Sequence, residues 1–75
     1  MPADLAHAIL EMVVAKWRGA LEPQKEEWLR AQGMYEMVFC EHNELIAAER
    51  LLREAGRAIP ESKTGRLVAA KALLS

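Results

Sequence analysis

Apolar residues recur every three or four positions along most of the 75-residue chain. This spacing places them on one face of a helix and does not fit the alternation of a strand. Composition agrees, because 43 of the 75 residues are Ala, Leu, Glu, Lys or Arg, above the roughly one half that is typical of long helices. We therefore predict an all-α protein in which residues 1–75 form a single helical domain.

The residues that begin and end helices divide the chain into three segments. Asp4 is a candidate N-cap, and Pro23 suits the first turn of a helix because its missing N–H would be unpaired there anyway. Gly56 is a candidate C-terminal stop. The predicted helices cover about residues 4–21, 23–55 and 61–74.

The second segment is predicted to form one long helix that passes through Gly33. Trp28, Tyr35 and His42 stay seven residues apart across this glycine, so the apolar register does not change there. A glycine costs about 1 kcal/mol relative to alanine inside a helix, so Gly33→Ala is expected to raise the melting temperature. Such a helix would be about 50 Å long, too long for a compact chain of this size to enclose.

The chain carries more apolar helical surface than three helices of this length can bury. Apolar positions of the first segment cover roughly 200° of the helical wheel, whereas a surface helix needs a stripe of about 100°. The fold class expected is an elongated, hairpin-like layer of three helices, completed by dimerisation into a helical bundle. The residues expected at the interface with a second copy or another protein are Trp17, Trp28, Tyr35, Val38, Phe39, His42, Leu45, Ile46 and Leu52.

Some of these residues allow a second interpretation. The aromatic residues at helical spacing are interpreted as core or interface, with a ligand-binding box as the alternative. His42 and Glu49 fall where an apolar residue is expected, so they either set the register of the pairing or lie exposed at its edge. His7 and Glu11 are interpreted as a solvated contact, and Cys40 as a small, half-buried apolar residue.

Charge is distributed unevenly along the chain. Residues 1–49 carry a net charge of −5, and residues 50–75 carry +4. The basic residues of the last third either complement a helix dipole and pair with Glu49 and Glu54, or form a docking patch for phosphates or an acidic surface. The residues of this candidate patch are Arg50, Arg53, Arg57, Lys63 and Arg66.

The residues needed for catalysis or metal binding are scarce and do not form a motif. The densest group of potential ligands is Cys40, Glu41, His42 and Glu44, but on a helix His42 points about 160° away from Glu44. We therefore expect no catalytic residues, no metal and no cofactor. One cysteine favours a reducing compartment, and neither a basic leader nor a long apolar run is present. We expect a cytoplasmic protein with no membrane partner.

The expected function is a small helical protein–protein interaction module that associates with itself and with another protein, as an adaptor, regulator, inhibitor or assembly factor. It is not expected to be an enzyme. The alternative is a nucleic-acid-binding regulator in which a dimer presents two basic C-terminal thirds. Steep weakening of nucleic-acid binding by salt would favour that alternative.

Overall fold

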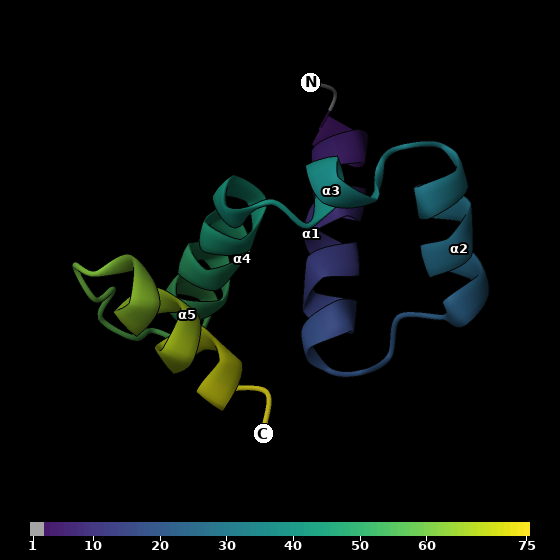
Figure 1. Ribbon diagram of the computed structural model, residues 1–75. Helices are drawn as coiled ribbons and strands as arrows, with labels where there is room; N and C mark the ends of the chain where they lie inside the picture. Colours follow the sequence, from purple (N-terminus) through teal and green to yellow (C-terminus); the bar gives the residue numbers. More distant parts are fainter. Residues whose placement is uncertain (1–2) are drawn as a thin grey trace.

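The computed structural model describes residues 3–75 as five helices joined by short turns (Figure 1). The prediction of an all-α protein is confirmed, because no strand occurs in this range. The Cα atoms span 37 × 27 × 19 Å, so no helix of residues 3–75 approaches the expected length of about 50 Å. The helices are α1 (Ala3–Trp17), α2 (Pro23–Ala31), α3 (Tyr35–Val38), α4 (Glu41–Glu54) and α5 (Lys63–Ala72).

The first and last predicted helices correspond to α1 and α5, but α1 ends at Trp17 and not near residue 21, and Asp4 lies in its first turn and is not its N-cap. Gly19 ends α1 at a φ of 69°, and its N–H donates to the Lys16 carbonyl at 3.0 Å. The Ala20 N–H reaches back to the Ala15 carbonyl at 2.8 Å, which completes a Schellman cap. At the start of α5, the Ser62 hydroxyl accepts a hydrogen bond from the Gly65 N–H at 2.9 Å.

The prediction of one helix over residues 23–55 is wrong, and the first break is at Gly33. This residue has a φ of 68°, the left-handed region that a side chain disfavours. Its N–H donates to the Arg30 carbonyl at 3.0 Å, and the Met34 N–H donates to the Leu29 carbonyl at 2.9 Å. Met34 also packs against the cluster that contains Leu29. Gly33 therefore ends α2 with the same kind of cap that ends α1.

The second break, at Cys40, contains neither glycine nor proline. Cys40 is half-buried and has extended backbone angles (φ −71°, ψ 161°) at the start of α4. The Asn43 amide donates to the carbonyls of Met37 at 2.9 Å and Val38 at 3.1 Å. In a continuing helix, backbone N–H groups would donate to these two carbonyls. Because the Asn43 side chain donates to them instead, the chain can leave α3 without carbonyls that lack a hydrogen bond.

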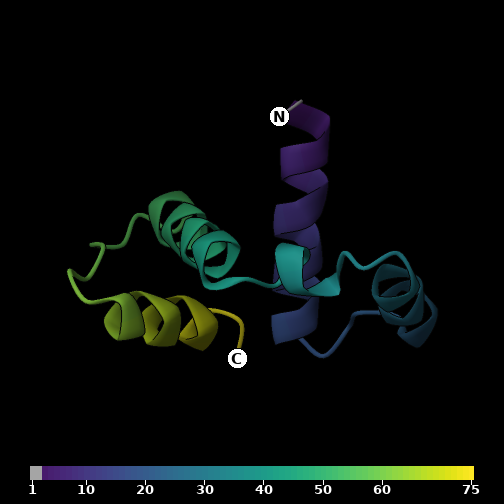
Figure 2. The same cartoon turned by 45° about the horizontal axis from the view of Figure 1, so that its top comes forward.

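Two small core clusters join α1 to the helices on its two sides, whose arrangement is visible in Figure 2. The first joins α1 to α2 and α3 through Ile9, Leu29 and Val38. The second joins α4 to α5 through Ala48, Leu52 and Ala70, with Trp17 from the end of α1 packed against it. As a result α1 stands in the middle, with α2 on one side and the α4–α5 pair on the other (Figure 1).

Gly33→Ala is now expected to lower the melting temperature, by about 4–8 °C for a loss of about 1 kcal/mol. A Cβ atom at this position would meet nothing within 4 Å, so the loss comes from the left-handed backbone alone. Thermal unfolding followed by circular dichroism measures it. The matched control is a synthetic chain with D-alanine at position 33, which accepts this φ and should not destabilise. A higher melting temperature for the L-alanine variant would contradict the cap.

Candidate functional site

The residues predicted to form one interface do not share a surface. Val38 and Leu52 are 0% and 1% exposed and lie in the two core clusters of this chain. The half-buried members of the set are Trp17, Tyr35, Phe39 and Leu45, and the exposed members are Trp28, His42 and Ile46. The breaks at Gly33 and Cys40 separate these residues, because positions seven apart share a face only within one continuous helix.

The half-buried aromatic rings are covered by cations of the same chain. The Tyr35 and Phe39 ring centroids lie 4.8 Å apart, and Lys16 Nζ lies 5.0 Å and 4.6 Å from them. The Arg30 guanidinium also packs against Tyr35, 3.7 Å from its ring centroid. These two rings therefore pack within the chain, and Tyr35 also lines a small open cleft with Arg30, Gly33 and Glu36.

The expected basic docking patch is largely paired with acids. Arg50 bonds Glu54 at 2.9 Å, and Lys63 bonds Glu41 at 3.0 Å. The predicted ion pairs with Glu49 and Glu54 are thus confirmed for two arginines. Arg50 pairs with Glu54, and Arg66 pairs with Glu49 at 3.4 Å. Arg66 also donates to two carbonyls of the preceding turn, at 2.7 Å and 3.0 Å.

Arg53 and Arg57 are exposed members of this basic set, and within residues 3–75 they are the two members without an ion-pair partner. Exposed ion pairs are worth only about 0.2–1 kcal/mol each, so the paired cations could still exchange partners. The free positive charge of this set is nevertheless reduced to two side chains on one end of α4 and the turn after it.

Side chains that could carry chemistry do not converge. No group of three His, Cys, Asp or Glu residues in the described part of the chain could hold a metal ion. His42 is exposed on α4. No helix within residues 3–75 is both long and apolar enough to cross a bilayer.

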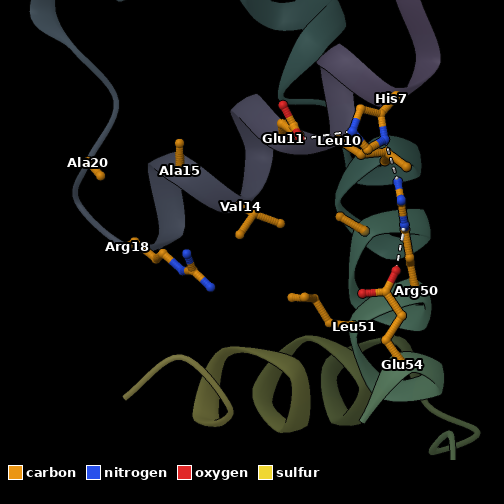
Figure 3. A pocket seen from close by; sticks show the side chains of 11 residues that line it. His7, Leu10, Glu11, Val14, Ala15, Arg18, Ala20, Arg50, Leu51 and Glu54 are labelled. Carbon is orange, nitrogen blue, oxygen red and sulfur yellow. Dashed lines mark hydrogen bonds and ion pairs between the residues drawn. The ribbon is translucent and has the colours of Figure 1, made fainter. Parts of the chain in front are cut away.

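Two shallow grooves flank α1. The α1–α4 groove has apolar walls from Leu10, Val14, Ala47 and Leu51, as Figure 3 shows for the labelled residues. The α1–α2 groove lies on the other side; its largest apolar residues are Leu5, Met12, Leu21, Trp28, Leu29 and Met34. Glu11, Ala15 and Ala20 line both grooves. We call these two grooves and the ridge between them the α1 surface.

Polar side chains form the rim of the α1–α4 groove (Figure 3). His7 Nε2 lies 2.8 Å from Glu11 Oε1, and Arg50 Nη1 lies 3.2 Å from His7 Nδ1. Arg50 also donates from Nε to Glu54 at 2.9 Å. The His7 and Glu11 side chains are 53% and 68% exposed, so their interpretation as a solvated contact is confirmed. Arg18 stands at the other end of the groove.

The α1 surface was not among the predicted interface residues, apart from Trp28. The available signal was the roughly 200° apolar arc of the first segment, twice the usual width. Ile9 and Val13 use one part of that arc in the core, at 3% and 0% exposure. Leu10 and Val14 use another part in the α1–α4 groove.

No family model matches this chain, and neither a curated protein nor a solved structure does. The function is therefore argued from the surfaces described above.

Proposed function

We propose that this protein is a small helical interaction module that associates with itself through the α1 surface and can present the remaining apolar side chains to another protein. The observation that carries the proposal is the size of its accessible surface. The chain exposes 5199 Å², whereas a compact monomer of its mass exposes about 4,600 Å². The excess of about 600 Å² approaches the roughly 800 Å² that each partner buries in a standard interface.

The size of the core supports the same proposal. Eight hydrophobic residues are buried in the described chain, and three of them are alanines, Ala47, Ala48 and Ala70. A chain below about 70–80 residues rarely obtains more than 3–5 kcal/mol from such a core. The single cysteine, Cys40, cannot form an intrachain disulfide. Association would add buried apolar area that the isolated chain lacks.

Exposed apolar side chains also occur away from the α1 surface. Met37 and Val68 are 50% and 63% exposed, and Ile46 and Ile59 are 37% and 40% exposed. Single exposed apolar residues are common on protein surfaces. These four residues lie on different elements, so each could contact a further protein only as a single side chain. The continuous apolar area lies beside α1.

Size-exclusion chromatography with light scattering tests self-association. At micromolar concentrations we expect a mass near twice the 8.4 kDa of one chain, and dilution should return it towards one chain by mass action. Circular dichroism on the same fractions reports whether the chain is folded. A well-folded species that stays at 8.4 kDa across the concentration range would contradict the proposal.

Nucleic-acid binding by the basic third is the alternative to be measured beside it. Arg53, Arg57 and Lys71 are its exposed cations without an ion pair among residues 3–75. Fluorescence anisotropy with labelled DNA and RNA gives the test. Binding at about 50 mM salt that weakens with a log–log slope of several units would favour this alternative. Absence of binding at that salt concentration would remove it.

A further inference from the structure

We propose that α1 pairs with the α1 of a second copy in antiparallel orientation, so that Glu11 of one chain lies against Arg18 of the other. This inference rests on the proposed self-association and names its contact. A two-fold axis generates the ion pair twice, because the same patch is used on both subunits of such a dimer. The register that places Glu11 against the partner's Arg18 also places Val14 against the partner's Ala15.

The positions of Glu11 and Arg18 on α1 support this pairing. They are seven residues apart, which is close to two turns and about 10.5 Å along the axis. Residues at this spacing share a face of the helix, and both side chains line the α1–α4 groove. The Arg18 N–H donates to the Val14 carbonyl at 3.0 Å, so the helical path extends to Arg18. Antiparallel pairing then opposes unlike charges, whereas parallel pairing in register would oppose like charges.

Both side chains can take a further partner. Arg18 is exposed, and it has no ion pair in the part of the chain that the structure describes. Glu11 contacts His7 through Oε1 alone, which leaves Oε2 to accept from a second donor. A guanidinium from a neighbouring chain can therefore bind Glu11 without displacing His7.

The charge balance of the α1–α4 groove favours a second copy over a strongly charged partner. Its lining carries two arginines, Arg18 and Arg50, and two glutamates, Glu11 and Glu54. An acidic peptide or a nucleic acid would meet both glutamates, and a basic partner would meet both arginines. Arg50 and Glu54 already pair with each other within the chain, and a reversed copy of α1 presents Arg18 to Glu11 and Glu11 to Arg18, which is the condition for electrostatic complementarity.

The shape of α1 allows a close approach. Ala15 lines both grooves, and helices pack at about 8–10 Å, with the shorter distances where side chains are small. The core residue Ile9 packs with Val38 of α3, which occupies another side of α1 (Figure 2). Pairing through Val14 and Ala15 would therefore use apolar surface that the core leaves open.

Charge exchange tests the contact. Glu11→Lys alone and Arg18→Glu alone each place like charges together twice, so we expect either single variant to raise the dimer dissociation constant about tenfold or more. The double variant restores unlike pairs in reversed order, and its dissociation constant should return to within about threefold of the original value. Sedimentation velocity at low salt measures all of these constants, and circular dichroism confirms that each variant is folded.

The matched control for Arg18→Glu is Arg53→Glu, which makes the same arginine-to-glutamate change on exposed α4 surface outside both grooves. It should leave the dissociation constant of the dimer unchanged. Rescue by the double variant supports the contact. If the original chain dimerises but the single variants dimerise equally well, or if the double variant stays as weak as the single variants, this pairing is wrong while self-association stands. If the original chain is a folded monomer, the proposed function itself fails.

Discussion

Leu52→Ala is expected to lower the free energy of unfolding by about 2–5 kcal/mol. Leu52 is 1% exposed and is packed in a cluster with Ala48 and Ala70. Ala48 and Ala70 have no rotamers with which to fill the space, so only the surrounding side chains, such as Leu67 and Leu73, can move into the cavity that the substitution leaves. A core of this size supplies about 3–5 kcal/mol in total, so a large part of the chain should unfold. Urea denaturation followed by circular dichroism measures the change.

Ile46→Ala is the matched control on the same helix. Ile46 is 37% exposed and lies outside both core clusters, so its loss should stay near the 0.5 kcal/mol or so that is usual for surface changes. The sequence places Ile46 and Leu52 together in one expected interface, whereas the structure separates them. Equal losses from the two variants would contradict the described core.

The helix ends that could be predicted are those set by one residue with a strong local preference. Pro23 begins α2 and Gly56 ends α4, as their local preferences predict. Gly56 takes a φ of 68° and its N–H donates to the Arg53 carbonyl at 3.0 Å. Such preferences act over a few residues, so the sequence around them is sufficient.

The two breaks inside the expected long helix depend on contacts between parts of the fold. Gly33 can continue a helix at a cost of about 1 kcal/mol or end it in the left-handed region, and Met34 packing in the first cluster favours the end. At Cys40 the decisive group is the Asn43 amide, which binds carbonyls five and six residues earlier. Neither contact leaves a periodic pattern.

The candidate site could be predicted in part for the same reason. The apolar arc of the first segment indicated a helix with neighbours on more than one side, and α1 does lie between two core clusters. The seven-residue spacing from Trp28 to His42 indicated a shared face that a broken helix does not have. Once α2, α3 and α4 are separate, the open apolar area moves to the grooves beside α1.

Trp17→Ala is expected to cost about 3–5 kcal/mol of stability. Trp17 ends α1 and packs against the α4–α5 cluster, and its Nε1 donates to Glu44 Oε2 at 3.1 Å. Lys71 Nζ of α5 lies 5.3 Å from the indole. One side chain thus joins α1 to the last two helices. Trp28→Ala is the control at a chain concentration low enough for the protein to be monomeric, because Trp28 is 54% exposed in the single chain and its loss there should be about 0.5 kcal/mol.

Trp17→Phe separates the packing of the ring from the hydrogen bond. Phenylalanine keeps an aromatic ring in the cluster but has no donor for Glu44, so the loss should be close to the roughly 0.5–1.5 kcal/mol of one hydrogen bond. Glu44 is half-buried, and water can hydrate its carboxylate after the exchange, which keeps the loss small. In chemical denaturation, the loss of free energy of unfolding should therefore be much larger for Trp17→Ala than for Trp17→Phe, and smallest for Trp28→Ala. If Trp17→Phe were as damaging as Trp17→Ala, the contact with Glu44, and not apolar packing, would hold α1 against α4.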